Sequence, residues 1–144
     1  MAIKQVTPPD AQALIGRGYR YLDVRTEAEF AAGHPASAVN IPIFVRDAAT
    51  GQMAPNADFL ATVETTFPKD SQIVLGCMSG MRSQRAAELM AGAGYGDLCN
   101  MQGGFGGARD QFGRVVTPGW VETGLPICTD CAPENTYAGL RSRR

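Results

Sequence analysis

Short apolar runs alternate with segments of helical periodicity along most of this chain. The runs predict strands at residues 3–6, 19–24, 38–41, 72–76 and 97–101. Helices are predicted after Thr7, from the capping box that starts at Thr26, after Asn56, and from Arg82 onward. The last two have apolar faces made of Phe59, Leu60, Val63 and Phe67, and of Ala86, Leu89 and Met90.

This order of strands and helices predicts an α/β fold with a central parallel sheet and helices on both faces. Residues 73–75, an uninterrupted Ile-Val-Leu run, are typical of a strand that is buried on both sides. In such a sheet, functional sites form beyond the carboxyl ends of the strands. We expect one domain over residues 1–126 and a mobile tail over residues 127–144, where no periodicity is evident.

Three segments have a weaker pattern. Residues 46–56 are expected to form a surface loop, residues 109–112 a short helix, and residues 117–126 a last helical turn.

Composition narrows the functional classes. The chain has 144 residues, of which 44% are hydrophobic and 19% charged, and its net charge of -1 gives no electrostatic case for binding nucleic acid or a membrane surface. No apolar run has the length of a membrane span, and residues 1–10 do not resemble a signal or transit peptide, so a cytoplasmic location is expected. The four cysteines are then interpreted first as thiols.

Cys77 is the candidate nucleophile. It follows the apolar 73–75 run directly, and it precedes small residues and a helix that begins near Arg82. Gly80 permits a loop whose N–H groups converge on an anion, and the helix start adds positive potential. With Arg82 and Arg85 nearby, the segment favours an ionised thiolate at Cys77 and an anion beside it.

The same residues carry a family resemblance. Cys77-Met-Ser-Gly80-Met-Arg82-Ser83 resembles the C-x-x-G-x-R-[ST] active-site loop of rhodanese-type sulfurtransferases. Further matching segments, in the family's order, are Leu22-Asp-Val-Arg25 with Glu29-Phe30 and Gly33-His34, then Ala38-Val-Asn-Ile-Pro42, Gly103-Gly104, and Trp120-Val-Glu-Thr-Gly-Leu-Pro126. They extend over nearly the whole chain. In two places the sequence departs from the family: Ser37 stands where a glycine is usual, and residues 109–119 are inserted before Trp120.

The resemblance implies a rhodanese-like fold and a sulfur relay with no cofactor and no metal. Thiosulfate or a similar donor gives sulfur to Cys77, and cyanide or a thiol then removes it. Thioredoxin and a sulfur-accepting protein are further acceptor candidates. The substrate-binding residues expected on this basis are Met78, Ser79, Gly80, Met81, Arg82 and Ser83, with Arg82 holding the oxyanion end of the donor. Asp23 and Arg25 are expected to support the loop rather than touch substrate.

The remaining candidates have simpler interpretations. His34 is expected to be structural, Glu29 to be a cap or surface carboxylate, and Cys99 to lie in the core. Cys128 and Cys131 form a C-x-x-C pair without the second pair that a zinc site needs, and we expect them to be incidental thiols.

Two other functional classes remain open. A cysteine phosphatase or arsenate reductase of related fold would normally have five residues between cysteine and arginine, whereas Cys77 and Arg82 are separated by four. A persulfide-carrying module that binds a partner without turnover is the other alternative, because fold does not guarantee function.

Overall fold

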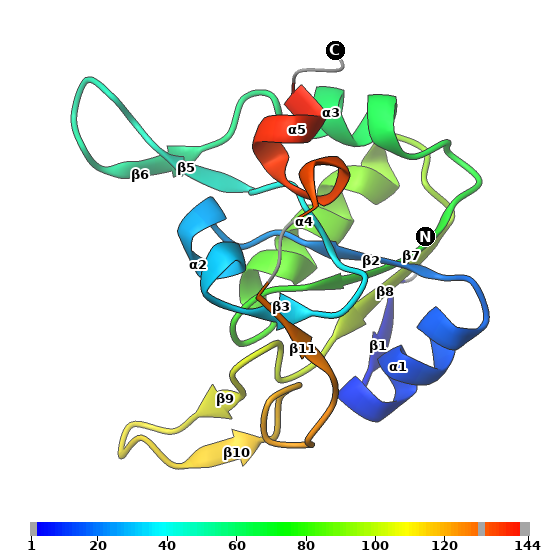
Figure 1. Ribbon diagram of the computed structural model, residues 1–144, viewed down its shortest axis with the longest axis vertical. Coiled ribbons are helices and arrows are strands. Elements are labelled where there is room, and N and C mark those ends of the chain that lie inside the picture. The colour runs from blue at the N-terminus through cyan, green and yellow to red at the C-terminus, as the bar shows by residue number, and fades with distance from the viewer. Residues whose placement is uncertain (1–2, 130–131, 142–144) are drawn as a thin grey trace.

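The centre of the molecule is a parallel sheet of five strands (Figure 1). The computed structural model describes residues 3–129 and 132–141. The strands, in spatial order, are β1 (Lys4–Val6), β8 (Asp97–Met101), β7 (Gln72–Gly76), β2 (Arg20–Asp23) and β4 (Val39–Asn40). Every neighbouring pair is parallel, which confirms the predicted sheet.

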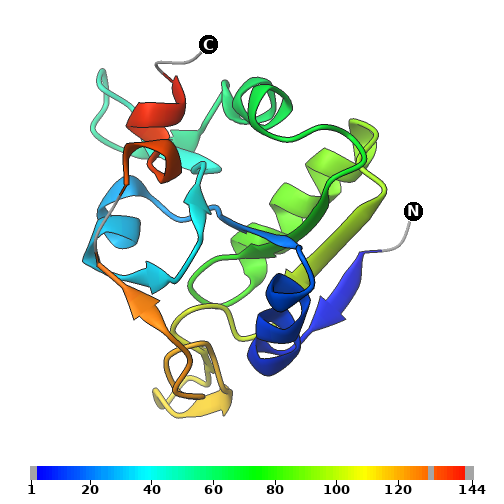
Figure 2. The same cartoon turned by 45° about the vertical axis from the view of Figure 1, so that its right-hand side comes forward.

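Helices cover both faces of this sheet, as predicted. One face carries α1 (Pro8–Gly16) and α2 (Glu27–Ala32), and the other carries α3 (Phe59–Thr66), α4 (Met81–Gly92) and α5 (Tyr137–Arg141). In Figure 2, α1 (dark blue) lies at the lower side of the sheet and α3 and α5 lie at the top.

The two faces follow from the two-residue period of the strands. Leu22, Ile73 and Leu75 point into the core beneath α3 and α4, whereas Tyr21 and Val74 point toward α1. All five side chains are at most 1% exposed. The central strand β7 is buried on both faces, in agreement with its continuous Ile-Val-Leu run, whereas β2 buries Tyr21 and Leu22 between the charged residues Arg20 and Asp23.

In α4, one predicted core residue is wrong. Leu89 is 45% exposed, and its expected place in the apolar face is taken by Ala87, which is fully buried beside Ala86 and Met90. Small residues suit this face because the helix packs directly over β7 and β8.

The weakly patterned segments differ from expectation. Residues 46–56 are part of an antiparallel hairpin, β5 (Phe44–Arg46) with β6 (Met53–Pro55), rather than an irregular loop. The expected helix over 109–112 is a second hairpin, β9 (Ala108–Arg109) with β10 (Val115–Thr117). The Asp110 carboxylate fixes its turn by accepting hydrogen bonds from the N–H groups of Phe112 and Arg114. Aspartate commonly stabilises turns by bonding backbone N–H groups a few residues ahead.

Two further boundaries are corrected. Asp58, and not Asn56, is the residue before α3, while the Asn56 side chain bonds the Asp58 N–H and the carbonyl of Pro42. The helical turn expected over residues 117–126 is confined to residues 119–124, where the Thr123 N–H donates to the Gly119 carbonyl at 3.2 Å, because Thr117 belongs to β10. The buried Trp120 donates from its ring to the Pro126 carbonyl at 2.8 Å.

The described part of the tail packs against the domain, and the mobility expected of residues 127–144 stays a prediction. β11 (Ile127–Cys128) pairs with β3 (His34–Pro35). After the short η1 helix (Pro133–Asn135), α5 places Tyr137 and Leu140 in the core, where they are 2% and 3% exposed. Within residues 3–129 and 132–141, no helix has the length and apolarity that a membrane span needs.

Candidate active site

Cys77 lies at the carboxyl end of the central strand β7, at the start of the loop that leads into α4. Gly80 ends this loop as the residue before the helix, with φ of 112°. That conformation is unfavourable for residues with a side chain. It turns the Gly80 N–H back onto Cys77, where it donates to Sγ at 3.0 Å. A backbone donor at this distance stabilises negative charge on the sulfur.

The loop is held from outside by the turn after β8. The N–H of Phe105 donates to the Cys77 carbonyl at 2.7 Å, and that of Gly106 donates to the Met78 carbonyl at 2.9 Å. Gly104 is required at this contact, since a Cβ there would lie 2.4 Å from the Cys77 carbonyl oxygen. Cys77 itself is 1% exposed.

A buried polar chain continues from the sulfur. The hydroxyl of Ser83 lies 3.4 Å from Cys77 Sγ, 3.2 Å from the Gly80 carbonyl and 2.5 Å from Asn100 Oδ1. A single hydroxyl proton serves these acceptors, so Asn100 and Cys77 compete for it. Sequence reasoning missed Asn100, although a polar residue within the otherwise apolar 98–101 segment was the available signal.

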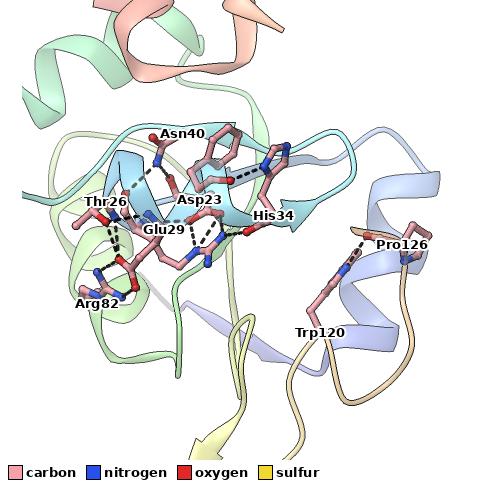
Figure 3. Close-up of polar contacts among 11 residues, drawn as sticks. Asp23, Thr26, Glu29, His34, Asn40, Arg82, Trp120 and Pro126 are labelled. Carbon is pink, nitrogen blue, oxygen red and sulfur yellow. Dashed lines mark hydrogen bonds and ion pairs between the residues drawn. The ribbon is translucent and has the colours of Figure 1, made fainter. Parts of the chain in front are cut away.

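Arg82 is bound by a carboxylate. Its Nη1 and Nη2 donate to the two oxygens of Glu29 at 2.9 and 3.0 Å (Figure 3). Partial burial would raise the pKa of Glu29, but the hydrogen bonds from Arg82 and Thr26 outweigh it and lower that pKa to about 2. The same pairing raises the pKa of Arg82. Glu29 is thus both the expected helix cap and the unexpected partner of the predicted substrate-binding arginine.

The second arginine of the site is fully buried. Arg25 forms a two-pronged pair with Asp23, with Nη2 at 2.8 Å from Oδ2, and it also donates to the Gly33 carbonyl at 2.7 Å. Its guanidinium lies 4.4 Å from the centre of the Phe105 ring. Phe105 also bonds the Cys77 loop through its N–H, so Arg25 and Asp23 lie where a role in supporting that loop is expected.

The other predicted loop residues differ in their exposure to solvent. The Met81 side chain is 81% exposed and that of Met78 is 37% exposed, whereas Ser83 is fully buried. A cavity of about 540 Å³ adjoins the loop, and Met78, Ser79, Arg109 and Glu122 are among the residues that line it. Arg85 is exposed on α4. That these loop residues bind substrate stays a prediction.

The remaining histidine and cysteines lie in other surroundings. His34 is buried, stacks on Phe30 and donates through Nδ1 to the Phe30 carbonyl at 2.8 Å, which agrees with the structural interpretation (Figure 3). Cys99 lies in the core, where burial raises the pKa of its thiol. Cys128 lies in β11, and Cys131 falls outside the described residues. Within the described part of the chain, no group of three or more potential metal ligands occurs.

Comparisons with known proteins agree with this geometry. A family model described as a rhodanese-like domain matches residues 7–110. Thiosulfate sulfurtransferase 16, chloroplastic, from Arabidopsis thaliana is 36% identical over 81% of this chain and 85% of its own length. Rhodanese-like domain-containing protein 15, chloroplastic, from the same plant is 37% identical over 81% of this chain. This chain spans only 57% of that relative's length. A location for the present chain stays a prediction.

The structural comparison gives the same fold. The crystal structure of Rv0390 from M. tuberculosis superposes with a TM-score of 0.74 at 28% identity, covering 90% of this chain and all of the other. A rhodanese-like domain protein from Staphylococcus aureus superposes with a TM-score of 0.57 at 22% identity and covers 80% of this chain, which supports the fold alone.

Proposed function

The chain belongs to the family of rhodanese-like domains, and from that premise we propose that it transfers sulfane sulfur through a persulfide on Cys77. The observation that carries the proposal is the Gly80 N–H at 3.0 Å from Cys77 Sγ, at the start of α4. Backbone N–H groups in the first turn of a helix have no partner within the helix, so they are available to an anion beside the sulfur.

The proposed reaction has two half-reactions. In the first, the Cys77 thiolate attacks the outer sulfur of thiosulfate, the S–S bond of the donor breaks, and sulfite leaves with the electron pair. The enzyme then holds Cys77–S–S⁻. In the second, cyanide or a thiolate attacks the terminal sulfur, and the Cys77 thiolate is released. Splitting the transfer in this way lets one cysteine serve donors and acceptors that never meet.

The loop residues have distinct proposed roles. The N–H groups at and after Gly80 hold the charge of the persulfide, and the Ser83 hydroxyl, 3.4 Å from the sulfur, supplies a further hydrogen bond when its proton turns away from Asn100. Arg82 contacts the oxyanion end of the donor. Asp23 and Arg25 hold Phe105 in place, and Phe105 in turn supports the Cys77 loop.

The test is an intact mass measured after incubation with thiosulfate. We expect the unmodified protein to gain the mass of one sulfur atom, and a reductant to remove it. Cys77→Ser should gain nothing and lose thiosulfate-to-cyanide activity, because serine is a poor sulfur acceptor. Cys99→Ala is the matched control and should still be loaded, since Cys99 is a core residue. Loading of Cys77→Ser at the wild-type level would contradict the mechanism.

The tail cysteines provide a separate control. We expect the double variant Cys128→Ser, Cys131→Ser to keep most of its activity and to hold a Cys77 persulfide of unchanged lifetime, because one cysteine suffices for the relay. A much longer persulfide lifetime in this variant would instead identify the pair as an internal sulfur acceptor.

A further inference from the structure

We infer that Glu29 is a specificity-determining residue, which keeps Arg82 in a neutral pair so that the site selects sulfur donors by their charge. The inference rests on the proposed function and refines its substrate class. Donors that carry little charge beyond the reacting sulfur use the site with the pair intact. A dianionic donor such as thiosulfate must take Arg82 from Glu29.

Glu29 is fixed from two sides. Its Oε1 accepts from the Thr26 N–H at 3.0 Å, which closes the capping box of α2, and both its oxygens accept from Arg82 (Figure 3). A carboxylate that is anchored by its own helix cap remains in position without the arginine. Glu29 therefore stays in place and competes with an anionic donor for the Arg82 guanidinium.

The neighbouring arginine cannot take over this role. Arg25 is 1% exposed, and its guanidinium is shared among Asp23, the Gly33 carbonyl and the Phe105 ring. Both guanidinium groups at this edge of the sheet are thus matched by a carboxylate. A dianionic donor can bind to backbone N–H groups of the loop and the helix start, but the arginines that could bind its sulfonate are already paired with carboxylates.

The Glu29–Arg82 pair is nevertheless open to exchange. The side chains are 28% and 27% exposed, against 1% and 2% for Asp23 and Arg25. Ion pairs with this degree of solvent access contribute little net free energy, so an anionic ligand can replace one partner. Glu29 should therefore weaken thiosulfate binding without abolishing it.

The two classes of donor differ in whether Arg82 has to leave Glu29 during the reaction. With thiosulfate, the Cys77 thiolate takes the outer sulfur and a sulfite dianion leaves, so charge at the sulfonate needs a cation. With an alkyl persulfide, the Cys77 thiolate attacks the sulfane sulfur of R–S–SH, the S–S bond breaks, and RS⁻ leaves while the proton stays with the transferred sulfur. The second step presents no sulfonate to Arg82.

The experiment compares Glu29→Gln with Glu27→Gln. The glutamine at position 29 retains a side-chain acceptor for the Thr26 N–H, and Glu27 is an exposed residue of the same helix, so its variant makes the same change in net charge. The donors are thiosulfate and the persulfide of 2-mercaptoethanol, with cyanide as acceptor. Circular dichroism checks folding, and Glu29→Met, in which Thr26 can still cap the helix, is the second variant.

We expect Glu29→Gln to raise kcat/KM for thiosulfate about tenfold, through KM, because a charged hydrogen bond to the sulfonate replaces the one to Glu29. Its effect on the persulfide donor, and both effects of Glu27→Gln, should stay within about twofold. The gain for thiosulfate should vanish in an Arg82→Ala background. An equal gain for both donors, or no gain for thiosulfate, would overturn the inference.

A binding measurement separates this inference from the proposed function. Thiosulfate should bind Cys77→Ser, Glu29→Gln about tenfold more tightly than Cys77→Ser alone in a calorimetric titration. If neither donor ever loads Cys77, the proposed function fails, while this titration still decides the role of Glu29. Equal affinities of the two proteins would refute that role.

Discussion

The two arginine–carboxylate pairs at the carboxyl edge of the sheet have the same chemistry and different surroundings. Asp23 and Arg25 are two residues apart, at most 2% exposed, and covered by the Phe105 ring. Glu29 and Arg82 are 53 residues apart and retain a little over a quarter of their side-chain exposure. The first pair joins the end of β2 to the Gly33 carbonyl, and the second joins α2 to the first turn of α4.

Burial decides what each pair can do. Removing one partner from a buried pair leaves a charge that water cannot reach, so the pair behaves as a fixed structural unit. A partly exposed pair is screened by solvent, and either partner can accept another ion at modest cost. The buried Arg25 is therefore suited to a structural role, whereas the partly exposed Arg82 is able to bind a ligand.

The most severe test of this contrast removes the carboxylates one at a time. We expect Asp23→Ala to lower the free energy of unfolding by about 3–5 kcal/mol, because Arg25 stays buried without its counter-charge. Glu29→Gln should cost about 1 kcal/mol or less. Urea denaturation of both variants measures the difference, and losses of equal size would mean that burial does not distinguish the pairs.

A second test addresses the aromatic cover of Arg25. Phe105→Leu should cost about 2 kcal/mol, since a desolvated cation–π contact is lost along with ring packing. Phe112→Leu is the matched control, because its ring lies 5.6 Å from the exposed Arg114 guanidinium and is itself 71% exposed. We expect that variant to stay within about 0.5 kcal/mol of the unmodified protein. Comparable losses in urea denaturation would argue against a special role for Phe105.

A third test uses pH. The pKa of Glu29 falls from 4.5 to about 2 on folding, so its contribution to stability is fully present above about pH 5 and is lost as the pH falls toward 2. Because solvent screens the pair, we expect a contribution of about 1 kcal/mol at pH 7. The difference in unfolding free energy between the unmodified protein and Glu29→Gln should therefore shrink between pH 6 and pH 3. A difference that is constant over this range would contradict the lowered pKa.

The contrast also explains what the sequence could and could not predict. The five-stranded sheet, the helices on both faces and the position of Cys77 at a strand end depend on local patterns, such as the 73–75 apolar run and the glycine at position 80. The supporting role expected of Asp23 and Arg25 rests on the family resemblance and on their place at a strand end near the site.

The remaining contacts join distant segments. The pairing of Glu29 with Arg82 spans 53 residues, and that of Ser83 with Asn100 spans 17. No local pattern distinguishes a glutamate that only caps a helix from one that also binds an arginine. The hairpin at 108–117 and the burial of Tyr137 were missed for related reasons, since turn chemistry at Asp110 and a core surface provided by α3 determine them.

The smallest expected effect concerns the turn at residues 36–37, which follows β3. Ser37, with φ of 75°, is the one residue other than glycine with a positive φ in residues 3–129 and 132–141. This conformation costs an L-residue about 1–2 kcal/mol, and a glycine there loses part of that gain to its greater freedom in the unfolded chain. We expect Ser37→Gly to stabilise the protein by about 0.5–1 kcal/mol in thermal or urea denaturation, and the gain should persist in Glu29→Gln because the two sites share no contact. Ala36→Gly, one residue earlier and without a positive φ, should instead destabilise by a similar amount. If both glycine variants lower stability, the turn imposes no strain on Ser37.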